Sequence, residues 1–277
     1  MSNVVHLLTF CSDRNKLHRL ESTLSRQRDF IEQKIRFHPI VVDQSQYVGF
    51  VSKIYETRKY IVDAGFKPDD VICFVDAYDV IVNHADHLME KFLHFHTDLV
   101  IGAELNSYPE GYDHRYPPSP TNYKYVNSGG YIGYAKAILN VLSWKPDNEI
   151  RAMCEGGGDQ RYFIEYYLFH RGFANIALDH YQRIFQNMYK TCWNEFRILM
   201  VDDAKPLCLN VATNTVPAFL HFNGESFYGT ERATGRPVNM MEIYANPDLA
   251  HSEEMISVGD KYAIEWNHNW GSIPSIP

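Results

Sequence analysis

Two aspartates, Asp76 and Asp79, interrupt an otherwise apolar stretch, "VICFVDAYDVIV" at residues 71–82. Carboxylate oxygens are hard ligands suited to Mn²⁺ or Mg²⁺, and such an ion can in turn neutralise a diphosphate. The spacing alone is weak evidence, because a chain with this much aspartate contains a D-x-x-D by chance. In the alternative interpretation, Asp76 caps a turn. The pair indicates a metal site only if the fold places it where ligands bind.

The first half of the chain alternates between strand-like and helix-like segments. The predicted elements are, in order, a strand at 4–10, a helix at 13–34, a strand at 37–43, a helix at 51–65 and a strand at 71–75. Gly65 is a plausible C-cap for the second helix, with Pro68 following. Strand, helix, strand order implies a parallel sheet, in which ligands bind beyond the carboxyl ends of the strands. Asp76 directly follows such an end.

The second half continues the pattern less regularly. We predict a helix at 85–95, a strand at 98–104, a loop at 105–125, a strand at 131–135 and a helix at 158–172 ending at Gly172. The loop is rich in proline and tyrosine and is long enough to suggest a functional surface. The tail after about residue 225 has weak periodicity and is not assigned. Since no repeat or low-complexity linker interrupts the chain, we expect one domain, 1–277.

The composition narrows the class of protein. With 277 residues, 45% of them hydrophobic, the chain can build one large α/β core. A net charge of -8 argues against a general binder of nucleic acid or anionic membranes, which calls for a basic face. The five cysteines are odd in number and lack C-x-x-C spacing, so we expect reduced thiols. With no signal-peptide pattern and no apolar run near the roughly 20 residues that span a bilayer, we expect a cytoplasmic protein.

Five blocks of sequence occur in the order known from one family. They are "FVDAYDV", "YVNSGGYIGYA", "GDQRYF", "LDHYQRIFQN" and "HFNG". In these blocks the chain resembles the glycosyltransferase domain of the procollagen lysyl hydroxylase and collagen glycosyltransferase family, standing without the hydroxylase. The resemblance covers about residues 4–225, which leaves 226–277 as a C-terminal extension. It implies a GT-A type α/β fold with a mostly parallel central sheet.

The resemblance also implies a metal site and a donor. Family members use Mn²⁺ and a UDP-sugar, usually UDP-glucose or UDP-galactose, and their metal ligands match Asp76, Asp79 and His221. Two carboxylates and one imidazole leave coordination positions open for diphosphate oxygens. Considered alone, His221 would more often be a hydrogen-bonded structural histidine. Mg²⁺ is the other ion that suits this ligand set.

Further positions are carried over from the family as donor-binding residues. The resemblance implies that Tyr78 packs on the uracil ring and that Thr9 contacts the uridine, although a core role explains either residue. The "NSGG" block would bring the backbone close to the donor, or else form a tight turn. The donor-binding residues implied in this way are Thr9, Lys53, Tyr78, Asn127, Ser128, Gly129 and Gly130.

The catalytic segment departs from the family pattern. Asp159 and Gln160 match an acidic-acidic-Gln segment at the sugar, but Gly158 stands at the first acidic position. Without the resemblance, Asp159 is most simply the N-cap of the helix that follows. The segment "GFVSK" before Lys53 is less glycine-rich than in the family, and Phe222 replaces a glycine in "HFNG". We therefore expect donor affinity or donor identity to differ.

Three hypotheses for function follow. The first is an active transferase that moves glucose or galactose to a hydroxyl acceptor, with Asp159 stabilising an oxocarbenium-like sugar. The second is a nucleotide-sugar-binding module without activity, which Gly158 motivates. The third is a metal-dependent phosphohydrolase with Asp76 as nucleophile. The resemblance suggests hydroxylysine or galactosyl-hydroxylysine in a collagen-like protein as acceptor, and a glycan is the alternative.

Overall fold

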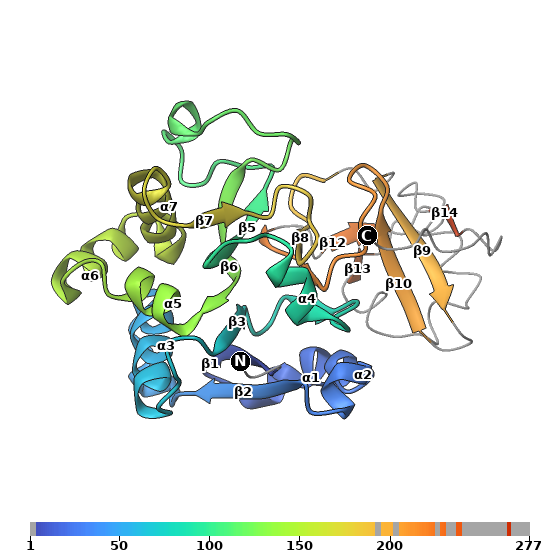
Figure 1. The fold of residues 1–277 in the computed structure, drawn as a ribbon, viewed down its shortest axis with the longest axis horizontal. Helices are drawn as coiled ribbons and strands as arrows, with labels where there is room; N and C mark the ends of the chain where they lie inside the picture. The colour runs from blue at the N-terminus through green and yellow to red at the C-terminus, as the bar shows by residue number, and fades with distance from the viewer. Residues whose placement is uncertain are drawn as a thin grey trace.

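The computed structural model describes residues 4–191, 195–201, 205–224, 228–230, 237–239 and 265–266. Its centre is a six-stranded sheet in the order β2-β1-β3-β6-β5-β7 (Figure 1). These strands are β1 (Val5–Cys11), β2 (Ile35–Val41), β3 (Val71–Val75), β5 (Leu99–Glu104), β6 (Tyr125–Tyr134) and β7 (Ile176–Leu178). Only β6 runs antiparallel to its neighbours β3 and β5, while the other pairs are parallel. The predicted α/β fold with a mostly parallel central sheet is confirmed.

Helices cover both faces of this sheet, and the strands are apolar on both faces as a result. Within β3, Ile72 and Phe74 join the core cluster that contains α3, α5, α6 and α7, whereas Cys73 joins the cluster with α1 and α4. The helices are α1 (His18–Leu24), α2 (Arg28–Ile31), α3 (Val51–Asp63), α4 (Leu88–Leu93), α5 (Ala135–Leu142), α6 (Asp147–Glu155) and α7 (Gly158–His170). Three short 3₁₀ helices are η1 (Arg14–Leu17), η2 (Gln44–Gln46) and η3 (Asp113–Arg115).

Smaller sheets extend the fold beyond the central one. One of them joins β4 (Val80–Val82), β11 (Phe219–His221) and β8 (Phe185–Asn187), with β11 in the middle. The remaining strands are β9 (Phe196–Val201), β10 (Lys205–Asn210), β12 (Tyr228–Thr230), β13 (Pro237–Asn239) and β14 (Glu265–Trp266). Most of the expected extension, 226–277, lies outside the described residues, so the single-domain expectation stays a prediction. The described part of the chain contains no helix with the length and apolar character to cross a membrane.

Most predicted elements exist, and their boundaries shift by a few residues. The strand at 71–75 is confirmed residue for residue, and Gly65 has the left-handed φ of +67° expected after the end of a helix. The single helix predicted at 13–34 is wrong, because Gln27 is extended and separates α1 from α2. Its side-chain amide bonds Thr23 O and the Ala85 N–H instead, so contacts with a distant segment replace helical ones.

Other boundaries differ for similar reasons. The strand predicted at 131–135 begins six residues earlier, at Tyr125, and ends at Tyr134, so "NSGG" lies inside β6 and is not a tight turn. The last predicted helix ends at His170, before Gly172. The sequence patterns gave no indication of α5 and α6. Cys11, Cys73, Cys154 and Cys208 are free and buried, as expected of reduced thiols, while Cys192 lies outside the described residues.

Candidate metal and donor site

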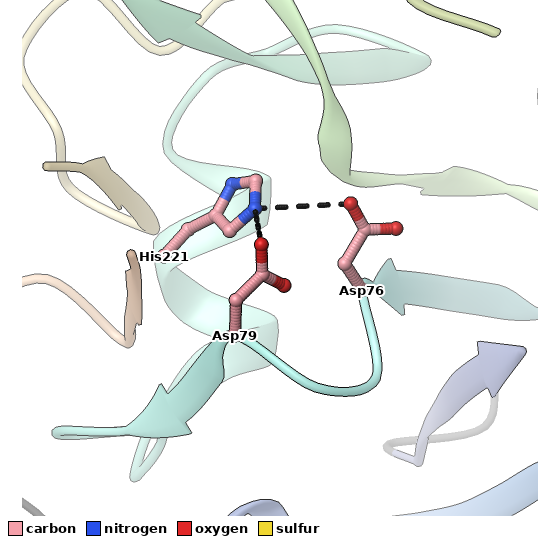
Figure 2. A group of neighbouring side chains, drawn as sticks. All are labelled: Asp76, Asp79 and His221. Carbon is pink, nitrogen blue, oxygen red and sulfur yellow. Dashed lines mark hydrogen bonds and ion pairs between the residues drawn. The ribbon is translucent and has the colours of Figure 1, made fainter. Parts of the chain in front are cut away.

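Three side chains that could hold a metal ion converge at the carboxyl end of β3. Asp76 follows the last residue of β3, Asp79 precedes β4, and His221 ends β11, which pairs with β4 (Figure 2). Nε2 of His221 lies 3.1 Å from Oδ2 of Asp79 and 3.7 Å from Oδ2 of Asp76. One ligand atom from each of the three residues lies within 4.8 Å of the others. The structure thus brings the predicted metal ligands together.

The electrostatics of this group are those of carboxylates crowded around one imidazole. Burial alone would lower the pKa of His221, but the carboxylates of Asp79 and Asp76 outweigh it and raise this pKa. For Asp79 the effect of burial is likewise outweighed, and the contact with His221 lowers its pKa. Burial raises the pKa of Asp76, and Lys53 offsets this only in part. Asp76, Asp79 and His221 together therefore carry an excess of negative charge, and a bound divalent cation would neutralise it.

Gly129 of β6 leaves the space that this group occupies. A Cβ atom at Gly129 would overlap the His221 ring and lie 2.7 Å from Oδ2 of Asp76. The backbone of β6 is itself close, because Asp76 donates its N–H to the carbonyl of Gly129 at 2.8 Å. At Gly130 a Cβ would lie 2.5 Å from the ring of Phe185. The two glycines of "NSGG" are thus needed for close packing of a strand against the site.

Lys53 and Asp159 lie next to the metal group. Nζ of Lys53 is 2.8 Å from Oδ1 of Asp76 and 2.5 Å from Oδ2 of Asp159, and its side chain is only 12% exposed. Burial opposes the charge on Lys53, but the two carboxylates outweigh it and raise its pKa. The cation of Lys53 therefore bridges the proposed metal side and the proposed sugar side.

The helix-cap interpretation of Asp159 is wrong. α7 begins at Gly158, Gly157 occupies the N-cap position, and no side chain caps the helix. Asp159 lies in the first turn, 5% exposed, where a carboxylate also interacts favourably with the helix dipole. Gly158 has a φ of +68°, a conformation that side chains rarely adopt, and its position faces the Phe50 ring at 3.6 Å. The left-handed backbone therefore favours glycine at the position before Asp159.

Glu104 is a buried carboxylate that the sequence analysis did not single out. It ends β5, and its oxygens accept hydrogen bonds from Asn127 at 3.2 Å, Gln160 at 2.7 Å and Asn223 at 3.0 Å. Burial raises the pKa of Glu104 to about 7, although these hydrogen bonds oppose the shift. A signal was present: Glu104 ends an apolar strand, "DLVIGAE", in the same way that Asp76 follows "VICFV".

Gln160 holds this carboxylate and β6 in place. Its Nε2 donates to Glu104 and to Val126 O, and its Oε1 accepts the N–H of Ser128 at 2.7 Å. Asn127 in turn accepts the N–H of Gly129 with its Oδ1. These bonds make Gln160 a positioning residue, and its direct contact with a sugar stays a prediction.

The two residues predicted to contact the uridine differ in accessibility. Tyr78 is partly exposed, and its hydroxyl accepts the N–H groups of Ser12 and Asp13 at 2.9 and 2.8 Å. The ring is therefore fixed at the edge of the site and keeps an accessible part. Thr9 is fully buried within β1, and its Oγ1 has no hydrogen-bond partner among the described residues. The structure does not present the Thr9 side chain at the surface of the site.

A separate cavity lies at the opposite edge of the sheet. It has a volume of about 710 Å³ and is lined by the amino ends of β5 and β7, the end of β6 and parts of α5 and α7. Leu99, Tyr134 and Ile176 belong to its lining, and it contains none of the predicted site residues. The chemistry that the sequence predicts is therefore confined to the carboxyl edge.

Comparisons with known proteins agree with this architecture. The family model described as the PLOD GT domain matches residues 40–231. The chain is 32% identical over 187 residues to the multifunctional procollagen lysine hydroxylase and glycosyltransferase LH3 of Homo sapiens, covering 66% of this chain and 24% of that protein. It is 28% identical over 187 residues to the procollagen-lysine,2-oxoglutarate 5-dioxygenase 1 of Gallus gallus, again covering 66% and 24%. The chain thus spans about a quarter of the length of these relatives.

A solved structure has a similar fold. It is that of a glycosyltransferase involved in the glycosylation of the major capsid of PBCV-1, with a TM-score of 0.50 and 11% identity over 80% of this chain and 95% of that one. At this identity the likeness concerns the fold alone, and it agrees with the predicted GT-A type architecture. Because the family model covers more than half of the sequence, the chain belongs to the PLOD GT domain family.

Proposed function

We propose that this chain is a metal-dependent glycosyltransferase that moves glucose or galactose from a UDP-sugar to a hydroxyl acceptor. The observation that carries the proposal is the convergence of Asp76, Asp79 and His221 at the carboxyl end of β3. Membership of the PLOD GT domain family supports the transferase class. The sugar and the acceptor are our inference from the relatives.

The donor diphosphate would meet a bound divalent cation at this edge. Asp76, Asp79 and His221 would hold Mn²⁺ or Mg²⁺, which when bound supplies charge that stabilises the leaving UDP. Lys53, already in contact with Asp76, adds a second cation beside the same position. The partly exposed ring of Tyr78 would stack on uracil. The close approach of β6 at Gly129 and Gly130 would bring its backbone near the donor.

Asp159 is the group that we assign to the sugar. When the sugar–phosphate bond breaks, positive charge develops on the sugar ring, and a fixed carboxylate nearby stabilises it. Asp159 is buried in the first turn of α7, and Lys53 holds its Oδ2. Asp159 and Asp76 both pair with Nζ of Lys53, so the carboxylate assigned to the sugar would lie one cation away from the metal ligands.

The acceptor that we propose is hydroxylysine or galactosyl-hydroxylysine in a collagen-like protein. Its support is the names of the relatives, which are procollagen lysine hydroxylases. A simple glycan is the alternative acceptor. Both offer a hydroxyl oxygen that attacks the anomeric carbon as UDP leaves.

The test is transfer of a labelled sugar by the purified chain. UDP-glucose and UDP-galactose are incubated with Mn²⁺, a hydroxylysine-containing collagen-like peptide and a panel of simple glycans. Labelled peptide supports the whole proposal, and labelled glycan alone replaces the acceptor. UDP binding without turnover favours the inactive binding module, and release of phosphate from phosphoesters favours the phosphohydrolase.

The Asp159→Asn variant tests the assigned roles. It keeps the size of the side chain and leaves Asp76, Asp79 and His221 intact, so we expect Mn²⁺-dependent UDP binding to persist. Transfer should fall roughly 100-fold or more, because a neutral amide does not stabilise developing positive charge. Calorimetry measures the binding and the labelled assay the rate. Wild-type turnover in this variant would remove Asp159 from catalysis.

A further inference from the structure

Asn187 has a buried side-chain amide that contacts Nδ1 of the His221 imidazole. It ends β8, which pairs with β11 in parallel register, so that Asn187 lies directly beside His221. Its Oδ1 is 2.8 Å from Nδ1 of His221, on the side of the ring away from the two aspartates. Asn187 is 1% exposed, so this contact is shielded from solvent.

The orientation of this amide is determined by a second bond. Nδ2 of Asn187 lies 2.9 Å from the backbone carbonyl of Ala103. Because a carbonyl only accepts, the NH₂ group must face Ala103, and the oxygen must face the imidazole. The backbone is fixed as well, since the N–H of Asn187 donates to Oε1 of Gln182 at 3.0 Å. The amide therefore cannot rotate without losing a buried hydrogen bond.

This orientation dictates the tautomer of His221. An oxygen beside Nδ1 requires that Nδ1 carry the hydrogen, which leaves the lone pair of the neutral ring on Nε2. That lone pair points toward Asp79 at 3.1 Å and Asp76 at 3.7 Å. In the neutral ring, a lone pair aimed at two carboxylates is unfavourable unless a proton or a metal ion lies between them. The ring is thus held in the form that a metal ion requires.

We propose that Asn187 is a positioning residue that fixes the tautomer and the orientation of His221 for metal binding. The inference rests on the proposed metal site. Histidine ligands commonly donate their second N–H to a carbonyl or carboxylate, and loss of that partner costs about 10- to 100-fold in metal affinity. The chain of contacts runs from the carbonyl of Ala103 through the Asn187 amide to Nδ1 of His221, and Nε2 on the other side of the ring faces the aspartates.

Two substitutions test whether the metal site depends on the Asn187 contact with His221 or on the Asn187 hydrogen bond to Ala103. Asn187→Leu removes the oxygen that accepts from His221, and we expect its Kd for Mn²⁺ to rise about 10- to 100-fold. Asn187→Asp keeps that oxygen but loses the N–H that bonds Ala103, and its Kd should stay within about threefold of wild type. If the bridge to Ala103 were what mattered, Asn187→Asp would lose affinity as strongly as Asn187→Leu. Calorimetry with MnCl₂ alone measures both.

The neighbouring Gln186 provides a matched control. Its amide is fully buried on the same strand and bonds Tyr123, Asn210 and the backbone carbonyl of Asn187, but it contacts neither the Asn187 side chain nor His221. Gln186→Leu should therefore lower stability while leaving the Kd for Mn²⁺ unchanged. A loss of Mn²⁺ affinity equal to that of Asn187→Leu would reduce Asn187 to a packing residue.

A readout without metal keeps the inference separate from the proposed function. Nitrogen-15 NMR of the His221 ring, in metal-free protein with the ring neutral, should show hydrogen on Nδ1 in the wild type and a mixture in Asn187→Leu. Hydrogen on Nε2 in the wild type would overturn the positioning role. Wild-type protein with the expected tautomer but no Mn²⁺ binding would instead overturn the metal site itself.

Discussion

Glu104 carries the largest unexpected electrostatic effect at the scale of single residues. It is 3% exposed and accepts three side-chain amides, yet burial still raises its pKa to about 7. Buried carboxylates with raised pKa values gather at functional sites. Glu104 therefore belongs with Asp76 and Asp159 in the account of this site.

Stability should depend on pH through Glu104. Its pKa in the folded chain, about 7, is above the ordinary 4.5, so its contribution to stability is complete below pH 4.5. That contribution is lost as pH rises through 7, and the loss amounts to about 3 kcal/mol. Glu104→Gln, which cannot ionise, should lack this part of the pH dependence. Urea unfolding of metal-free wild type and variant from pH 4.5 to 8 measures the difference, and parallel curves would contradict it.

Site residues could be predicted where a residue type suited to metal binding stood at a recognisable place in the sequence pattern. Asp76 was found as a carboxylate after an apolar strand, and the ordered "HFNG" block added His221. Asn187 was not found, because an amide in "LDHYQRIFQN" acquires its role only when β8 pairs with β11. The alternative interpretation of Asp159 as an N-cap is wrong because the backbone places the cap at Gly157, and a φ of +68° at Gly158 cannot be read from periodicity.

At the scale of elements, β6 determines how closely the parts of the site can pack. It is the antiparallel strand between β3 and β5, and its residues 127–130 pass between the metal group and Glu104. Its run of small residues was visible in "YVNSGGYIGY", but the same letters also suit a tight turn. Because β6 pairs with β3 on one side and β5 on the other, these residues form an extended strand.

Gly129→Ala should disable the metal group without unfolding the sheet. The added methyl would overlap the His221 ring and press on Asp76, so either ligand must move. We expect the Kd for Mn²⁺ to rise about 10-fold or more, comparable to loss of a partner that orients a ligand. Calorimetry measures it. The control is Gly172→Ala, where a Cβ meets nothing within 4 Å and affinity should not change; equal affinities in the two variants would contradict the steric argument.

The strands of the central sheet were predicted except for β7, whereas α5 and α6 were missed and one predicted helix was wrong. A five-residue apolar run such as 71–75 is typical of a central strand in a sheet whose two faces are both covered by helices. The 13–34 segment had helical periodicity throughout, yet Asp29 accepts the N–H of His87 and Gln27 accepts that of Ala85. Such contacts between distant segments are absent from any local pattern, and they broke the predicted helix.

For the whole molecule, the site joins parts of the chain that lie far apart in sequence. Asp76 and Asp79 come from the β3–β4 connection, and His221 comes from β11, which pairs with β4 on one side and β8 on the other. Asp159 reaches the same edge from α7 by way of Lys53 in α3. Only the folded chain gathers these groups, so an unfolded chain would offer no equivalent site.

Binding of Mn²⁺ should therefore stabilise the fold as a whole. An ion that binds the native state alone contributes about 2.7 kcal/mol when its free concentration is 100 times its Kd. Thermal and urea unfolding, with MnCl₂ or with a chelator, should show this shift in the wild type. In His221→Ala, which lacks the ligand that joins β11 to the aspartates, the shift should nearly vanish. An equal shift in both proteins would mean that Mn²⁺ binds elsewhere, and the group formed by Asp76, Asp79 and His221 would have to be explained without a metal.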